Sequence, residues 1–419
     1  MTKYAALVLL TSASAAWAAC GGPANTSIDS AVTSGSDAPA NMCQPIGSIG
    51  NFYRRTPAPR LIAGTHRYPN NTVDLAITDP DLRWDDASAT WELYYHGPNA
   101  TDYQSAVTPM IRHARSADLT TWTIDDAPTL VAAAATGAWD HGTIATPTVV
   151  YNPDAPADRR YLMLYSGGND PSFAGLGFYN YAIGAAFSSD GTTFTRVAAA
   201  TSPHGLEGQV LTAADVFSGS EGIVGDPEVV LVNGTYQLWF SSFACNGPSC
   251  ANKTASGISH ASSTDGIHWT VAEAPVHTLL RLPAVPTSGG GQPSVIYDAA
   301  HCRYEMWLRS DAAMETADQP VVDDNMAGVW HATSQDGASW SVNYAGARDL
   351  RWNPTTPDAG EHLGLLTGAD VAMKGTSRYM VYSGFDDQNV PTGFRLPDGS
   401  QTGSRPGVIT LNVAARDAL

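Results

Sequence analysis

The chain has 419 residues, with 22 Lys plus Arg and 40 Asp plus Glu, so its formal net charge is −18. Only three of the basic residues are lysines and they form no stripe, which argues against a nucleic-acid surface. The 39 Gly and 27 Pro residues, with 43% hydrophobic and 15% charged residues, predict a turn-rich globular fold with a large core. A coiled coil or helical bundle is excluded.

The N-terminus reads as a targeting segment. Lys3 precedes an apolar run at residues 5–10, and Ala16-Trp17-Ala18 has the small-x-small pattern of a cleavage site, which predicts a signal peptide over residues 1–19. The run ending at Cys20 resembles a bacterial lipobox, although Trp17 stands where Leu is usual. We therefore expect a lipid on Cys20 and a flexible Ser/Ala/Gly/Pro-rich tether over residues 20–55. The protein would be secreted or a bacterial cell-surface or outer-membrane lipoprotein, touching a membrane only through the lipid.

The cysteine count fits an oxidising compartment. If Cys20 carries a lipid, four cysteines remain, and Cys245 and Cys250 flank a short turn that a disulfide could close. Cys43 would then be left with Cys302. Free buried thiols are the alternative.

Taken in chain order, the rest of the sequence repeats. A Ser-x-Asp turn with an aromatic residue four positions after the Asp occurs at Asp118, Asp190, Asp265 and Asp336, at separations of 72, 75 and 71 residues. Upstream of each, a Pro-containing β-branched run precedes an aromatic-rich strand. These runs begin at Asp79-Pro80, Thr146-Pro147, Asp226-Pro227 and Gln292-Pro293, with a fifth, proline-free copy at Gly368-Ala369.

Each unit reads as four short antiparallel strands with a hairpin at the Asp turn. Five such units predict an all-β fold, a five-bladed β-propeller over residues 56–419 that follows the signal peptide and tether. A strand near residues 60–63 would complete the fifth blade. The recurring aromatic residues are expected in the blade cores, the four Asp residues as turn caps, and His113, His260 and His331 as structural residues on one shared strand position.

In a propeller the first strand of each blade lines the central channel. By strand alternation, the residues on either side of each Pro are expected to point the same way. Five carboxylates would then converge on one axis: Asp79, Asp81, Asp226, Glu228 and Asp370. Crowded carboxylates acquire unequal pKa values, the condition for the acid–base chemistry of glycoside hydrolysis. Alternatively, these side chains accept backbone N–H bonds at strand starts or hold a structural cation.

The repeats resemble the five-bladed β-propeller glycosidases, namely the arabinanase/xylosidase group (family 43) and its invertase/levanase relatives (family 32), over about residues 60–419. The resemblance implies that Asp79 is the base or nucleophile and that Asp226 modulates a pKa. The family's acid, a Glu two residues before a Pro in the following blade, is replaced here by Gly291. Glu228 is the expected substitute, with Glu221 and Glu361 behind it.

Further residues are expected around the channel. Asp81, Gln292, Asp370 and His141 are candidates for substrate binding, and Trp84, together with Tyr179, for stacking on sugar rings. His362, after Glu361, could hold a calcium ion or its waters, as a channel His does in some of the resembling proteins. We expect no required cofactor and at most a structural calcium.

The sequence therefore predicts a monomeric glycosidase acting on extracellular polysaccharide or oligosaccharide that contains pentose or fructose. The alternative is a non-catalytic glycan-binding surface lipoprotein. Gly291 favours the alternative, whereas Asp79 and Asp226 oppose it. A phosphorylase-type activity is disfavoured because the channel segments contain no basic phosphate pocket.

Overall fold

The structure is a computed structural model. It describes residues 52–54, 60–102, 105–169, 181–217, 221–246, 252–272, 290–310, 315–316, 329–342, 359–362, 364–388, 390–397 and 404–416. The chain divides into two units, Met1–Met42 and Cys43–Leu419, and all described residues belong to the second.

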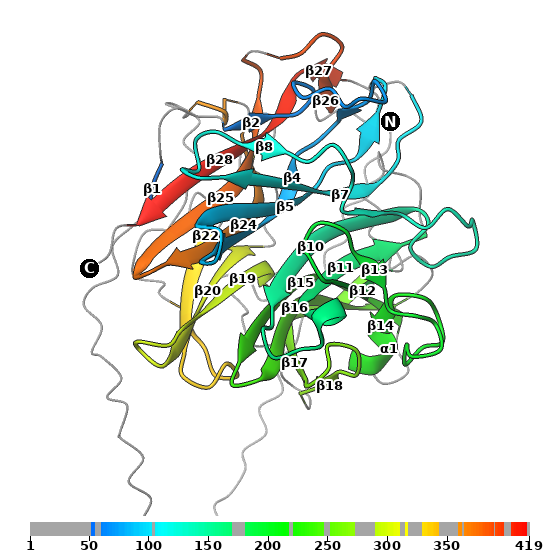
Figure 1. Ribbon diagram of the computed structural model, residues 1–419, viewed down its shortest axis with the longest axis vertical. Coiled ribbons are helices and arrows are strands. Elements are labelled where there is room, and N and C mark those ends of the chain that lie inside the picture. Colours follow the sequence, from blue (N-terminus) through cyan, green and yellow to red (C-terminus); the bar gives the residue numbers. More distant parts are fainter. Residues whose placement is uncertain are drawn as a thin grey trace, which may run out of the picture. The chain divides into compact units, whose positions relative to one another are not determined.

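Four blades are antiparallel sheets whose strands follow one another in the chain (Figure 1). The first has β4 (Thr78–Asp85), β5 (Thr90–His96), β7 (Met110–Ser116) and β8 (Thr123–Ile124), with β9 (Leu130–Val131) on β7. The second has β10 (Thr143–Tyr151), β11 (Tyr161–Gly168), β12 (Ala182–Ser188) and β13 (Thr195–Arg196), with β14 (Gln209–Leu211) on β12. The third has β15 (Glu221–Val232), β16 (Thr235–Asn246), β17 (Asn252–Ser263) and β18 (Thr270–Val271). The fourth has β19 (Gly290–Asp298), β20 (Arg303–Ser310), β22 (Val329–Ser334) and β23 (Ser341–Val342).

The fifth blade joins both ends of the propeller. It contains β24 (Gly364–Lys374), β25 (Ser377–Asp386) and β28 (Val408–Arg416), with β21 (Glu315–Thr316) on β24, and β1 (Tyr53–Arg54) and β2 (Leu61–Ile62) on β28. Two small ribbons pair β3 (Val73–Asp74) with β6 (Asn99–Ala100) and β26 (Arg395–Pro397) with β27 (Ser404–Pro406). Among the described residues, helix is limited to η1 (Ala157–Arg159) and α1 (Ala213–Val216).

The blades form a closed ring. Each inner strand, β4, β10, β15, β19 and β24, contacts the inner strand of the next blade, and β24 contacts β4. The all-β, five-bladed propeller expected from the repeats is confirmed. Closure of this kind leaves few free strand edges, which is the physical advantage of the architecture.

The ring is closed by strands from opposite ends of the chain. Leu61 pairs with Leu411 and Ile62 with Thr410, so the strand expected near residues 60–63 completes the fifth blade. β1 pairs with the same strand further along. Phe52 is buried with its ring against Trp307. Ordered propeller structure therefore begins before residue 56, inside the segment expected to be tether.

The Asp turns are capped as expected. In the first, Asp118 Oδ1 accepts the N–H groups of Thr120 and Thr121, at 2.7 and 2.9 Å. The turns at Asp190, Asp265 and Asp336 repeat these bonds. The N–H groups of Ser339 and Ala338 lower the pKa of Asp336 to about 2. Each turn thus favours an ionised carboxylate.

The recurring aromatic and histidine residues fill the blades. Trp122, Phe194, Trp269 and Trp340 lie in or against the hydrophobic clusters. The three strand histidines pair across strands with aromatic residues: His113 with Tyr94, His260 with Trp239 and His331 with Trp307. Their structural role is confirmed.

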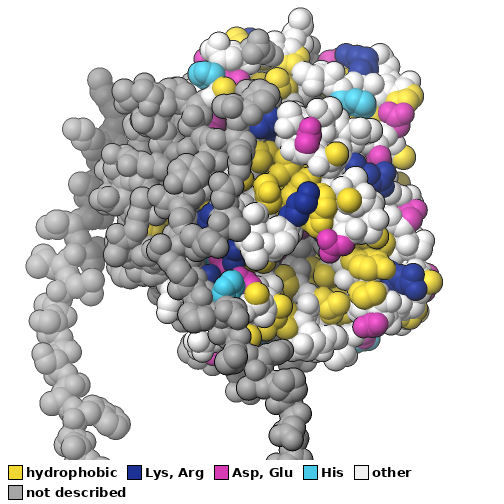
Figure 2. All heavy atoms as spheres, turned by 60° about the vertical axis from the view of Figure 1, so that its left-hand side comes forward, with side chains coloured by type: hydrophobic (Ala, Val, Ile, Leu, Met, Phe, Trp, Pro, Cys, Tyr) yellow, Lys and Arg dark blue, Asp and Glu magenta, His cyan; other side chains and the backbone are white. Residues whose placement is uncertain are grey.

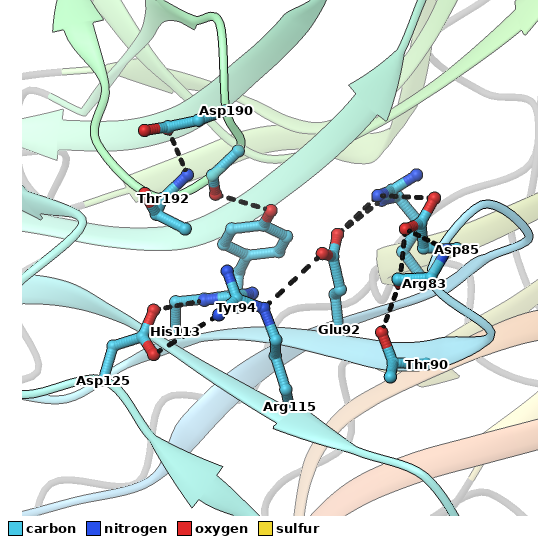
Figure 3. A network of polar contacts seen from close by, with 12 residues as sticks. Arg83, Asp85, Thr90, Glu92, Tyr94, His113, Arg115, Asp125, Asp190 and Thr192 are labelled. Carbon is cyan, nitrogen blue, oxygen red and sulfur yellow. Dashed lines mark hydrogen bonds and ion pairs between the residues drawn. The ribbon is translucent and has the colours of Figure 1, made fainter.

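A polar network links the first blade to the second (Figure 3). Arg83 on β4 binds Glu92 on β5, and Arg115 on β7 lies 3.8 Å from the same carboxylate. The Tyr94 hydroxyl donates to the carbonyl oxygen of Gly191, in the Asp turn of the second blade, at 2.8 Å. Side chains of the second strand thereby fix neighbouring blades to each other.

The surface carries no concentrated positive charge on the face that Figure 2 shows. There the Lys and Arg side chains of the described residues lie dispersed among neutral and acidic ones. In the described part of the chain, no helix has the length and apolar character needed to cross a membrane.

Candidate active site

The candidate site begins with a repeated backbone irregularity. Each of the first four inner strands has a β-bulge at its Pro, for example between Thr78 and Asp81 on β4. The residue before the Pro has a left-handed backbone conformation, with φ between 46° and 50°: Asp79, Thr146, Asp226 and Gln292. Non-glycine residues rarely adopt this conformation, and bulges re-aim side chains near active sites.

We call the residues before the Pro positions the rim. In chain order the rim comprises Asp79, Thr146, Asp226, Gln292 and, where the fifth blade lacks the Pro, Gly368. These five residues, together with Glu228 and Asp370, line a cavity of about 40 Å³. A cavity of this size can hold water. Asp79 and Asp226 are the only carboxylates of the rim, so the cavity brings together two of the predicted catalytic residues with Glu228.

Asp79 is held from both sides. The side-chain nitrogen of Gln292 lies 3.4 Å from Asp79 Oδ1, and His96 Nδ1 lies 3.8 Å from Asp79 Oδ2. A methyl group added at Gly368 would lie 3.3 Å from Asp79 Oδ1. The carboxylate therefore sits where the first, fourth and fifth blades meet, and its side chain keeps 19% exposure.

The residues after the Pro positions form a second ring, which we call the floor. Each floor residue accepts the N–H of the residue that follows the floor residue of the next blade. The bonds are Val149 to Asp81 (3.1 Å), Val229 to Thr148 (3.2 Å), Val295 to Glu228 (3.2 Å), Val371 to Ser294 (2.9 Å) and Leu82 to Asp370 (2.6 Å). The floor thus ties the five inner strands into a circle.

The floor corrects the expectation from simple alternation. Because the bulge inserts a residue between the paired positions, Asp79 and Asp81 lie at different depths, and Asp81 is only 6% exposed. Asp81 does not line the cavity itself. The alternative interpretation, that such carboxylates accept backbone N–H bonds, holds for all three carboxylates of the floor.

Those three carboxylates crowd together. Asp81, Glu228 and Asp370 each offer an oxygen within 4.8 Å of the others, and all are buried. Burial raises the pKa of Asp370 to about 6. Burial, followed by repulsion from the neighbouring floor carboxylates, raises the pKa values of Glu228 and Asp81 well above their usual range. The direction for Glu228 is the one required of a proton donor.

Two groups of described residues could hold a metal ion. One is the floor trio, whose three carboxylates supply the oxygen ligands that calcium prefers. The other is His362 with Asp386 and Asp387, in which His362 Nδ1 already lies 2.5 Å from Asp386 Oδ1. An imidazole in the ligand set suits a transition metal better than calcium. The donor chemistry therefore favours the floor for calcium and does not favour His362.

Three expected binding residues lie away from the cavity. Trp84 is five residues further along β4, donates to Asp86 Oδ1 at 2.9 Å, and has the Lys374 ammonium 3.6 Å from its ring centre. His141 Nδ1 lies 2.7 Å from the carbonyl oxygen of Ala133. Neither these two nor His362 lines the cavity, because each side chain is already engaged elsewhere. Gln292 and Asp370, by contrast, do line it.

Other predictions concern residues that the structure does not describe. Cys20, Cys43, Cys250 and Tyr179 lie outside the described residues, as do the side chains of Glu221 and Cys245. The lipid anchor and the Cys245–Cys250 disulfide therefore stay predictions. Cys302 is disulfide-bonded, and its partner is not among the described residues. Glu361 is buried and accepts the Tyr382 hydroxyl, away from the cavity.

Sequence reasoning missed His96 and Gly368. Aligning the second strands of the repeats would have singled out His96, because three of the other blades have serine at that register position: Ser166, Ser241 and Ser383. Gly368 is the fifth-blade equivalent of Asp79, which the missing proline obscured.

Comparison with known proteins identifies the architecture. No protein-family model and no curated protein matches the chain. Among solved structures, a complex of BT0996 named with RGII matches with a TM-score of 0.56 and 14% identity over 87% of this chain and 92% of that one. A family 117 glycoside hydrolase, Zg3597 from Zobellia galactanivorans, matches with a TM-score of 0.51 and 13% identity over 88% and 91%. The chain shares its fold with these proteins.

A third match widens the range of chemistry. An N-acetylgalactosamine deacetylase from F. plautii, in complex with blood group B trisaccharide, matches with a TM-score of 0.52 and 13% identity over 88% of this chain and 94% of that one. Identities this low carry the fold alone. Because one fold hosts several reactions, the reaction must be argued from the site.

Proposed function

We propose that the protein is a glycoside hydrolase that acts on extracellular polysaccharide or oligosaccharide containing pentose or fructose. The observation that carries the proposal is the rim: Asp79 and Asp226 stand on left-handed residues over one cavity, above floor carboxylates with raised pKa values. Residues held in sparsely populated conformations cost about 1–3 kcal/mol each and cluster at active sites.

Asp79 is the proposed base or nucleophile. Its two oxygens lie close to separate nitrogen atoms, those of Gln292 and His96, which orient the carboxylate while leaving part of it exposed. Asp226 is the proposed modulator of the acid's pKa. Its own N–H donates to Ser166 Oγ at 2.8 Å, which fixes the backbone on which the carboxylate stands.

Glu228 is the proposed acid. It lines the cavity, and its raised pKa keeps a proton available near neutral pH. Proton transfer to a leaving group contributes typically 10²–10⁴-fold to the rate. When calcium is bound, the proposed place is the floor, where its charge would favour ionised carboxylates. The metal would then support the ring instead of the proton donor.

The partner and location are proposals on the same footing. One structural neighbour is named as a complex with a trisaccharide, which supports a carbohydrate partner. The predicted signal peptide and lipobox-like Cys20 support a secreted or lipid-anchored monomer.

The test replaces Asp79 by Asn. Asp79→Asn should abolish hydrolysis of arabinan, xylan or fructan fragments, because the amide can neither accept a proton nor attack carbon. Glycan binding, measured by calorimetry, should persist. Asp154→Asn, in an exposed turn, is the matched control and should retain wild-type kcat. Wild-type rates in Asp79→Asn would refute the proposal.

A second function has specific support. Gly291 replaces the resembling family's acid, and Glu228 is committed to the Val295 N–H within the floor. Both observations favour a non-catalytic glycan-binding protein. Binding without turnover on the whole substrate panel would decide for this alternative.

A further inference from the structure

One position on the second strand of each blade ties that blade to the next. In three blades it is serine, paired across the inner strand at the residue before the rim position or its equivalent. Ser166 Oγ accepts the N–H of Asp226 at 2.8 Å, and Ser241 Oγ accepts the N–H of Gln292 at 2.9 Å. Ser383 Oγ donates to the carbonyl oxygen of Ile77 at 2.9 Å. A small hydroxyl at this position therefore has a structural role in the repeat.

The first blade departs from this pattern. His96 is the residue paired with Thr78, and it is only 6% exposed. Its Nδ1 lies 3.3 Å from Thr78 Oγ1 and 3.8 Å from Asp79 Oδ2. The fourth blade has Arg309 at this position, and its side chain is not described. A buried imidazole has thus replaced the hydroxyl in the blade that carries Asp79.

We propose that His96 is a positioning residue for Asp79, holding the carboxylate in the orientation that reacts with the sugar. The inference rests on the proposed hydrolase function and adds a residue to it. His96 contacts Oδ2 and Gln292 contacts Oδ1, so one nitrogen lies against each oxygen of the carboxylate. Rotation of the carboxyl group would break both contacts.

Exposure distinguishes the reacting group from its support. The Asp79 side chain is 19% exposed and the His96 side chain 8%, so the carboxylate lies nearer the cavity and the imidazole behind it. A separation of 3.8 Å is long for a hydrogen bond. Contacts of this kind are often long before substrate binds and tighten in the substrate complex.

The first experiment separates kcat from KM in the full-length protein. The probes are 4-nitrophenyl α-L-arabinofuranoside, 4-nitrophenyl β-D-xyloside and fructan fragments. His96→Ala should lower kcat by about 10–100-fold with KM changed less than about 2-fold, since misplacement of a catalytic group by about 1 Å has effects of this size. His96→Asn, whose amide nitrogen can replace Nδ1, should recover most of the loss. His260→Asn, at a structural histidine of the third blade, is the matched control and should retain kcat.

The second experiment is independent of activity. In protein labelled with ¹⁵N-histidine, Asp79→Asn should shift the His96 ring resonances, whereas Asp154→Asn should not. Equal losses in His96→Ala and His96→Asn, unchanged kcat in His96→Ala, or unshifted resonances would each overturn the inference. A wild type without turnover on these probes would end both proposals. Wild-type turnover that survives His96→Ala would end only this one.

Discussion

Asp79 and Asp81 lie two residues apart on one strand, and only Asp79 lines the cavity. The difference arises from one backbone angle, because Asp79 has φ of 50° and the strand bulges there. Thr146 takes the same conformation although β-branched residues resist it, and its hydroxyl lies 2.5 Å from Ser166 Oγ. At the scale of the residue, the surrounding contacts therefore impose the conformation that places each rim side chain.

Glu228 provides the residue-scale prediction. Glu228→Gln should fold normally, because its amide oxygen can still accept the Val295 N–H. Lacking an acidic proton, the variant should lose about 10²–10³-fold in kcat on poor leaving groups. On aryl glycosides with good leaving groups, which need no proton, the loss should be under about 10-fold. Steady-state rates on the two substrate classes check this.

Ser294, which occupies the same floor position in the fourth blade, offers a structural comparison. Ser294→Ala removes a floor acceptor without touching a rim residue, so it should lower stability. Equal losses by Glu228→Gln on both substrate classes would assign Glu228 to the floor alone and remove it as the acid.

The sequence located the rim carboxylates but not their support. Asp-Pro at matching repeat positions is a local signal, and it placed Asp79 and Asp226 at one cavity. The bulge was not foreseen, because alternation assumes a regular ladder. His96 was missed because it follows an ordinary aromatic strand, and only its partner across β4 gives it meaning.

At the scale of the element, the fifth inner strand differs most from its equivalents. β24 has Gly368 where the others have a rim side chain, and it lacks the Pro. Its register also shifts, between Leu366 and Asp370. The missing side chain leaves the space into which Asp79 fits.

Gly368→Ala tests this close approach. The added methyl group would lie 3.3 Å from Asp79 Oδ1 and 3.4 Å from the Asp79 backbone nitrogen, tighter than ordinary contact. Asp79 must then shift, so kcat should fall about 10-fold or more. Thermal unfolding should change little by comparison, since the rim is partly exposed.

Gly137→Ala is the matched control. A methyl group at Gly137 meets no atom within 4 Å, so kcat and the melting temperature should both stay at wild-type values. If Gly368→Ala also keeps wild-type kcat, the contact does not position Asp79.

Elements with local signals were predictable and those with distant partners were less so. The Asp turns, the Pro-containing inner strands and the aromatic second strands were all read from the sequence, because each carries its own residues. β2 was anticipated as the closing strand, but β1 was assigned to the tether. Its pairing depends on β28, more than 350 residues away, which no local pattern records.

At the scale of the whole molecule, the floor both joins the blades and brings like charges together. Its five hydrogen bonds link every inner strand to the next. Three of its five acceptors are carboxylates, so ionising all three in a buried space is unfavourable. The stability of the propeller should therefore depend on pH through these groups.

The sign follows from the raised pKa values. Between the pKa of an unfolded Asp and about 6, the folded protein keeps a proton on Asp370 that the unfolded chain has lost. Stability from this group is complete at low pH and is lost as pH rises through about 6. His260 acts in the opposite direction, since burial lowers its pKa to about 4 and favours the folded state as pH rises. Only a difference between variants isolates the floor.

Asp370→Asn provides that difference. The amide oxygen can still accept the Leu82 N–H but carries no charge, so the variant should gain stability relative to wild type as pH rises from 4 to 8. The gain should be on the order of 2 kcal/mol, measured by urea unfolding at each pH. Asp336→Asn is the control: the pKa of Asp336 is about 2, so its stability relative to wild type should be constant between pH 5 and 8. A flat difference for Asp370→Asn over the same range would show that the floor carboxylates ionise in the folded protein as readily as in the unfolded chain.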